Sequence, residues 1–178
     1  MTAKECITGR RSIRSFTDQP ISHEVLADII ETASCAPSWK NTQIVRYIAV
    51  EGEMKTKLAK CTSAYARNGE IMENAPVVMA ITIIQGRCGY ERDGSFTTDR
   101  GDGWQMIDVG VATHTFCLAA HEQGIGSVIM GIFDRKEAAE LLELPEGMDL
   151  VALIPIGYPA ETPNAPKRKS VDDLLSFK

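Results

Sequence analysis

The chain has 178 residues, of which 44% are hydrophobic and 24% charged, a composition that excludes a disordered or fibrous chain. Nineteen lysines and arginines against twenty-four aspartates and glutamates leave a net charge of −5. A general nucleic-acid or anionic-membrane surface is therefore not expected. The length predicts one domain over residues 1–178.

Cysteine usage and hydropathy predict a cytoplasmic protein. The five cysteines are widely spaced, form no CxxC pair and are odd in number, which argues against a zinc site or a disulfide framework. We expect them to be small core residues. The N-terminus lacks the apolar segment of a signal peptide, and no stretch approaches the roughly 18 apolar residues of a membrane span.

Helical and strand patterns alternate along the chain, which predicts an α/β or α+β class. Residues 76–85 form a continuous, largely β-branched run, typical of a strand buried on both faces. Residues 85–103 are polar and glycine-rich, and a loop of this length is often a lid or a binding loop. Residues 106–123 are apolar on nearly all sides, which predicts the central helix. We expect further helices over 2–9, 22–36, 54–65 and 134–145, strands over 46–51, 127–132 and 150–157, and a short apolar end over 171–177.

The first candidate site is a basic cluster near the N-terminus. Arg10, Arg11 and Arg14 surround Ser12, so three guanidiniums and a hydroxyl lie within five residues of a net acidic chain. Guanidinium forks match phosphate oxygens, which makes the cluster a candidate phosphate clamp. A solvated basic turn is the alternative.

The second candidate is the segment 36–43, which follows the second predicted helix. Its hydroxyl and amide side chains suit the edge of a heterocycle or a polyol chain. A proline-initiated turn that uses Ser38 and Asn41 for local backbone bonds explains the same residues.

The remaining signals are weaker. Residues 166–169 form a second basic cluster, or a solvated tail. The glycines of 124–127 allow a ligand to approach the backbone, although a helix C-cap explains Gly124 equally well. The three histidines lack metal-ligand spacing, and no P-loop or dinucleotide fingerprint is present.

Taken in chain order, these segments resemble the nitroreductase family of flavoproteins. The similar segments are RRSIRSF (10–16), APSWKNTQ (36–43), the helix over 104–120, GIGSVIMGIF (124–133), IPIGYPAE (154–161) and RKSVDDLL (168–175). The resemblance implies an α+β fold of three α-β-α layers, with helices flanking a central mixed sheet and a long central helix. It also implies a C-terminal extension that reaches the partner subunit.

By the same resemblance, FMN would lie at the interface of a homodimer. The segment 10–14 would hold the phosphate, ribityl and pyrimidine side, and Lys167, Arg168 or Lys169 would close on the phosphate. The turn over 36–43 of the partner subunit would line the flavin ring. The expected cofactor-binding residues are Arg10, Arg11, Ser12, Arg14, Pro37, Ser38, Trp39, Asn41, Gln43, Ile129, Met130, Gly131, Lys167 and Arg168, with no metal and no catalytic side chain.

The function implied is that of an FMN-dependent oxidoreductase, a nitroreductase-like flavoprotein. A hydride would pass from NADH or NADPH through flavin N5 to a small acceptor such as a nitroaromatic or a quinone, by ping-pong exchange. Arg14 would supply a positive charge near the N1 edge of the flavin. The alternatives are another flavin chemistry on the same fold (dehalogenation or dehydrogenation), a flavin-binding redox protein with little turnover, and a domain without flavin.

Overall fold

The structure is a computed structural model that describes residues 1–178, the side chain of Ser63 excepted. At its centre is a four-stranded sheet in the order β1-β2-β4-β3. All three strand pairs are antiparallel, and an isolated parallel bridge joins Ser12 to Ser127. The strands are β1 (Val45–Val50), β2 (Val77–Ile84), β3 (Gly126–Ser127) and β4 (Met148–Gly157).

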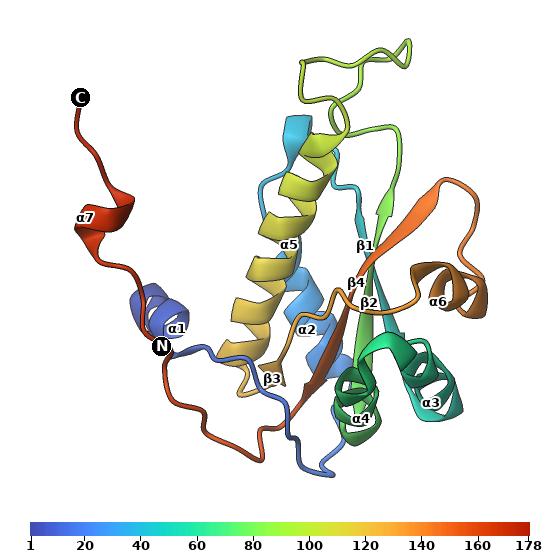
Figure 1. The fold of residues 1–178 in the computed structure, drawn as a ribbon, viewed down its shortest axis with the longest axis vertical. Helices are drawn as coiled ribbons and strands as arrows, with labels where there is room; N and C mark the ends of the chain where they lie inside the picture. The colour runs from blue at the N-terminus through green and yellow to red at the C-terminus, as the bar shows by residue number, and fades with distance from the viewer.

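Helices cover both faces of this sheet, which gives three α-β-α layers (Figure 1). One face carries α2 (His23–Ser34) and α5 (Gly103–Glu122), and the other carries α3 (Gly52–Lys60), α4 (Ala66–Asn74) and α6 (Arg135–Leu141). The short elements are α1 (Ala3–Gly9), η1 (Trp39–Asn41), η2 (Ser63–Tyr65) and α7 (Val171–Leu174).

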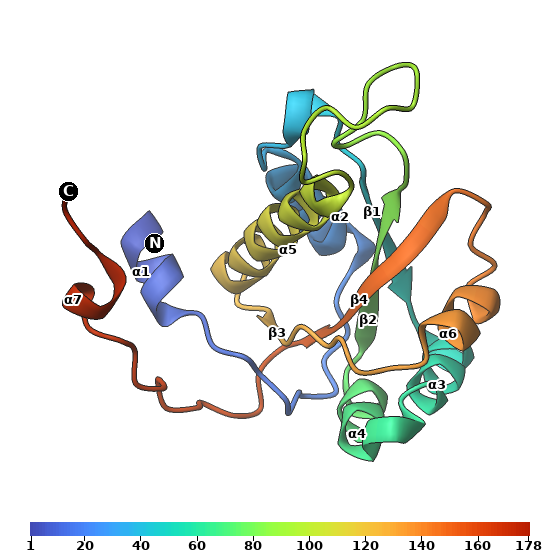
Figure 2. The same cartoon turned by 45° about the horizontal axis from the view of Figure 1, so that its top comes forward.

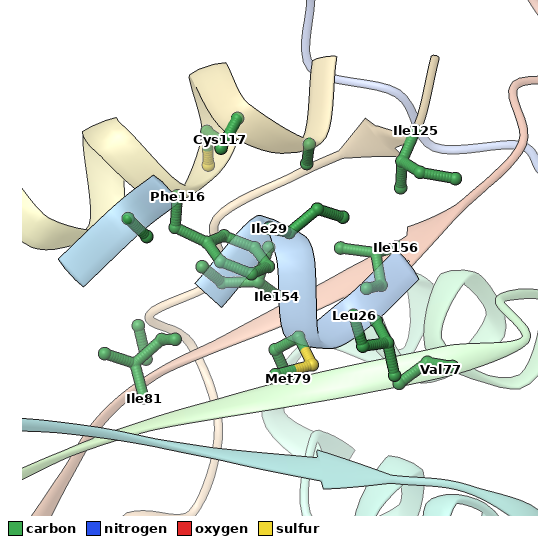
Figure 3. Packing of buried hydrophobic residues seen from close by; sticks show 14 of the residues in the cluster. Leu26, Ile29, Val77, Met79, Ile81, Phe116, Cys117, Ile125, Ile154 and Ile156 are labelled. Carbon is green, nitrogen blue, oxygen red and sulfur yellow. The ribbon is translucent and has the colours of Figure 1, made fainter. Parts of the chain in front are cut away.

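The β2 strand divides its side chains between two cores. Val77, Met79 and Ile81 pack with α2 and α5 in the core shown in Figure 3, where Phe116 of α5 lies near the centre. Val78 and its alternating neighbours pack on the opposite face, with α3, α4 and α6. Because both faces are buried, the whole strand is nearly continuously apolar, as predicted.

Two segments depart from this body. In Figures 1 and 2, α1 and the C-terminal segment with α7 extend to the same side, away from α3, α4 and α6. Among the helices that the structure describes, none has the length and apolarity needed to cross a bilayer.

Several predicted elements are confirmed. The capping box that starts α1 is present, with Thr2 accepting from the Glu5 amide, and Ser22 caps α2. The central helix forms, and residues 85–103 contain neither a helix nor a strand before α5 begins at Gly103. The fold is therefore the α+β fold expected, although its strands pair antiparallel where a mixed sheet was predicted, and only the isolated Ser12–Ser127 bridge is parallel.

Three predicted elements were wrong in extent. The helix expected over 54–65 ends at Lys60, where the Thr62 hydroxyl donates to the Ala59 carbonyl at 2.6 Å, and the unpredicted helix α4 follows. The strand expected over 127–132 is only two residues long, because beyond Ser127 it continues as a single bridge to β4. The helix expected over 134–145 ends at Leu141.

The cysteine prediction holds for four of the five residues. Cys6, Cys61, Cys88 and Cys117 are buried, and burial raises the pKa of the Cys61, Cys88 and Cys117 thiols. Cys35 is exposed, because it is the C-cap residue where α2 ends at the surface.

Candidate functional site

The arginine segment (residues 10–14) is fixed to the sheet at β3. The Ile13 amide donates to the Ser127 carbonyl at 3.0 Å. Gly126 lies so close that a Cβ there would be 2.7 Å from the Ile13 side chain. Backbone approach of this kind requires glycine, so the sequence at β3 determines where the arginines stand.

The side chains of the arginine segment leave guanidinium donors free. Among the hydrogen bonds of the described residues, the Arg10 guanidinium makes none, and that of Arg14 donates only to the Ser12 carbonyl at 3.3 Å. No carboxylate of the described side chains forms an ion pair with either. Arg11 differs, because its Nη1 donates to carbonyls of its own turn, at 2.8 Å to Thr8. The segment thus presents three cations without an ion-pair partner among the described side chains, and the donors of Arg10 and Arg14 are largely free.

Residues after β4 close the other side of the arginine segment. Oε1 of Glu161 accepts from the Arg14 amide at 2.5 Å. The basic residues Lys167, Arg168 and Lys169 follow on the exposed C-terminal segment. Because the second basic cluster follows Glu161 within a few residues, this part of the chain begins close to the arginine segment.

A polar cavity of about 390 Å³ lies beside Arg14. It is lined partly by α4, through Arg67, Glu70 and Asn74, and Asn74 Oδ1 accepts from the Phe16 amide at 3.0 Å. These residues were missed from the sequence because α4 was not predicted. In α4, residues 67, 70 and 74 share one face at helical spacing.

The imidazole of His121, which lies against Gly9 next to the arginine segment, has a lowered pKa. Burial lowers the pKa of His121, and the positive charges of Arg10 and Arg11 lower it further. The positive charges that disfavour protonation of His121 would also attract an anionic group to this surface.

The turn (residues 36–43) forms a second polar cluster, at the N-terminal end of α5. The Trp39 amide donates to both carboxylate oxygens of Asp108, at 3.0 and 3.1 Å, and the Trp39 ring lies 4.5 Å from that of Trp104. Ser38 Oγ accepts from the Gln43 amide at 3.1 Å. The turn is thus a folded unit built on α5.

The backbone of this turn is strained. Lys40, Asn41 and Gln43 have φ values of 45°, 55° and 47°, in the left-handed region that residues other than glycine seldom adopt. Strain of this kind gathers at ligand-binding sites, where the surrounding structure maintains it.

The arginine segment and the turn lie at opposite ends of α5. The turn contacts Asp108, whereas Gly9, directly before the arginine segment, lies against His121: a Cβ on Gly9 would be 3.1 Å from Nε2. Residues 108 and 121 are 13 apart, and at 1.5 Å of rise per residue this is about 20 Å. Figure 1 shows η1 and α1 near opposite ends of the helix. Within one chain, therefore, the structure does not bring the two clusters together.

The other predicted residues follow β3. Ile129 and Gly131 are exposed, whereas Met130 is buried and its backbone pairs with Leu153 in both directions. The Met130 side chain belongs to the core on the α3, α4 and α6 face. A cofactor contact by Ile129 or Gly131 stays a prediction.

A larger cavity of about 750 Å³ opens between α2 and β1. Val45, Tyr47 and Ala49 line it from alternate positions of β1, and Leu26 and Ile30 line it from α2. Since β1 is an edge strand, its outer backbone groups have no strand partner within the described sheet.

The fold and the electropositive segment define an α+β protein with a candidate phosphate-binding site. The family model described as the nitroreductase family matches residues 7–65 and 58–158, and the chain belongs to this family. An enzyme of Bacillus subtilis named FMN reductase (NAD(P)H) is 32% identical over 164 residues, which are 87% of this chain and 65% of that enzyme.

Two solved structures extend the comparison. A nitroreductase family protein from Streptococcus pneumoniae TIGR4 has a TM-score of 0.87 at 24% identity, and the alignment covers 99% of this chain and all of that one. A protein from Desulfovibrio desulfuricans, solved in complex with FMN, has a TM-score of 0.75 at 26% identity over 98% of this chain and 95% of that one. The first shows that the fold is shared.

Proposed function

We propose that this chain is an FMN-dependent oxidoreductase that oxidises NAD(P)H, with residues 1–178 forming a single FMN-binding domain. The observation that carries the proposal is the pair of unneutralised guanidiniums of Arg10 and Arg14 at the β3 edge. The relative named FMN reductase (NAD(P)H) and the FMN complex of a similar fold support the same assignment.

The arginine segment fits the phosphate end of FMN. A phosphomonoester carries a charge near −2 and accepts bidentate hydrogen bonds from guanidinium forks. Arg10 and Arg14 supply these donors with the Ser12 hydroxyl, and Arg168 with its neighbouring lysines supplies further charge from the C-terminal segment. The Glu161 carboxylate accepts from the Arg14 amide, so one negative charge lies beside these cations.

The turn binds the flavin ring of a neighbouring subunit. Since the two clusters are about 20 Å apart along α5, a second copy that contributes its turn brings both kinds of cluster to one flavin. The exposed face of α5 suits this pairing, because Met106 and Ile107 are 49% and 45% exposed on a helix that is apolar around its circumference. A homodimer with antiparallel α5 helices brings each arginine segment near the turn of the partner subunit.

The C-terminal segment reinforces this dimer. Val171, Leu174, Leu175 and Phe177 are all exposed, and Phe177 is 89% exposed. An exposed apolar tail of this kind marks an interaction site. The cavity beside β1 of the partner subunit offers an apolar floor and an unpaired strand edge to receive it.

When bound, FMN supplies the hydride chemistry. The chain binds and orients: the arginine segment anchors the phosphate, and the turn of the partner subunit fixes the ring. Arg14 places a positive charge beside the cavity that α4 lines. The acceptor is a small molecule, such as a nitroaromatic or a quinone, that exchanges with the nicotinamide.

Steady-state kinetics of the FMN-loaded protein test the reaction. Because donor and acceptor exchange in one pocket, initial rates at varied NADH and fixed quinone concentrations give parallel double-reciprocal lines. Intersecting lines would contradict the exchange, and absence of NADH and NADPH oxidation with every acceptor would contradict the enzyme assignment.

Subunit mixing tests the shared site. At limiting FMN, an Arg10→Ala chain and an Asn41→Gly chain are each expected to lose most of their activity, while their mixture regains activity because each heterodimer contains one intact site. Glycine at 41 retains the φ of 55° and removes only the side chain. A mixture no more active than its parents would show that both residues act within one chain.

A further inference from the structure

Asp108 is a buried carboxylate that no cation balances. It is 5% exposed, and no ion pair among the described side chains includes it. An ionised group in such a place is costly unless donors satisfy it. An apolar residue would serve packing alone better, so the carboxylate at this position requires another reason.

Asp108 accepts its hydrogen bonds from the backbone of the turn. Both carboxylate oxygens accept from the Trp39 amide, at 3.0 and 3.1 Å. Burial, together with Asp108, raises the pKa of the neighbouring Cys88 thiol to about 12, so this thiol stays neutral. The Trp39 amide is thus the donor that holds the carboxylate.

The hydrogen bond between Trp39 and Asp108 lies directly before the residues of the turn that have positive φ. Trp39 directly precedes Lys40 and Asn41, with φ values of 45° and 55°. The other polar side-chain bonds of the turn are local or exposed: Gln43 donates to Asn41 at 3.1 Å, and Lys40 pairs with exposed Glu91 at 2.9 Å. Among the hydrogen bonds of the described residues, the Asp108 contact is the part-buried one that ties the strained turn to α5.

We propose that Asp108 is the positioning residue that holds the turn over residues 38–43 in the conformation that lines the flavin ring. This inference rests on the proposed function for the identity of the ligand. Asp108 acts through the Trp39 amide, and Ser38 and Asn41 make the contacts with the ring of the partner subunit. Loss of the carboxylate frees the turn and leaves the arginine segment, at the other end of α5, in place.

Two substitutions of Asp108 and one matched control separate positioning from stability. Asp108→Leu removes both acceptors while filling most of the volume, and Asp108→Asn retains one acceptor oxygen. Asp102→Asn makes the same chemical change on an exposed aspartate at the start of α5, whose side chain caps nothing. We expect all three proteins to fold, because leucine at 108 adds to the largely apolar lining of the cavity between α2 and β1, and the two asparagine variants keep the size of the side chain.

The first readout is amide hydrogen exchange in the flavin-free protein. Exchange of residues 38–43 is expected to accelerate at least tenfold in Asp108→Leu, and to stay within about threefold of wild type in Asp108→Asn and Asp102→Asn, since one charge-assisted bond corresponds to about tenfold or more. Unchanged exchange in a folded Asp108→Leu protein would overturn the proposal.

The second readout is the bound flavin. The Kd for FMN is expected to rise about tenfold or more in Asp108→Leu, and the visible circular dichroism of the bound ring to move towards that of free FMN, with Asp108→Asn close to wild type. A lower melting temperature with unchanged flavin affinity and dichroism would assign Asp108 to stability alone. If the wild-type protein binds no FMN, the proposed function fails, and the exchange measurement still decides whether Asp108 holds the turn.

Discussion

Gly126→Ala tests whether β3 positions the arginine segment. A Cβ at residue 126 would lie 2.7, 2.8 and 3.0 Å from Cγ1, Cβ and Cγ2 of Ile13. Ile13 has no easy retreat, because it is buried and its amide is bonded to Ser127 at 3.0 Å. Overpacking of this degree costs about 1–3 kcal/mol of the free energy of unfolding. For a chain of this size the melting temperature falls by about 2–12 °C.

The assay pairs urea unfolding with FMN titration at one protein concentration. Gly103→Ala is the matched control: no atom lies within 4 Å of its added Cβ, so it is expected to be neutral or to stabilise by up to about 1 kcal/mol. Because Ile13 must move, Gly126→Ala also weakens FMN binding, which Gly103→Ala leaves unchanged. A Gly126→Ala protein with wild-type stability and wild-type FMN affinity would show that β3 does not position the arginine segment.

Three further predictions follow from the site and the proposed dimer. Arg10→Ala weakens FMN binding by about 1.5–3 kcal/mol, whereas Arg135→Ala on α6 does not; equal fluorescence titrations would count against the phosphate contact. The folded-state pKa of His121 lies below its unfolded value, so the unfolded chain takes up the proton first and stability is lost as pH falls through about 6.5, the ordinary pKa of histidine. His121→Gln therefore shows a smaller fall in the free energy of unfolding between pH 7.5 and 5.5, and an identical fall would contradict this. Phe177→Ser weakens the dimer by about 1.5–3 kcal/mol per tail, measured by sedimentation against Lys178→Ser, and an unaltered dimer would show that the tail packs elsewhere.

Elements with a strong local signal were predictable from the sequence. The caps at Thr2 and Ser22 place two helix starts, and the apolar run of β2 reveals a strand buried on both faces. The helix α4 was missed because it depends on packing between segments, which a local sequence pattern does not reveal. Residues 66–74 form a helix whose Gly69 packs within 3.0 Å of the Ala59 carbonyl, measured from an added Cβ, and no local pattern announces that contact.

The candidate site was predictable in its parts and not in its assembly. The arginine segment and the turn stand out by residue type, but their placement at opposite ends of α5 emerges only from the folded chain. Asp108 could not be singled out as the anchor of the turn, because its partner is the Trp39 backbone 69 residues away. Almost every residue has a backbone N–H, so the residue type at position 39 does not reveal that its amide bonds to Asp108.

The assignment as an NAD(P)H-dependent FMN oxidoreductase is tested by the visible absorption spectrum of the FMN-loaded protein, recorded before and after NADH or NADPH is added without oxygen. Flavin bands that bleach with either nucleotide, and return when a quinone is added, are the predicted result. A protein that takes up no FMN, or whose flavin bands persist with both nucleotides, would contradict the assignment as an NAD(P)H-dependent FMN oxidoreductase.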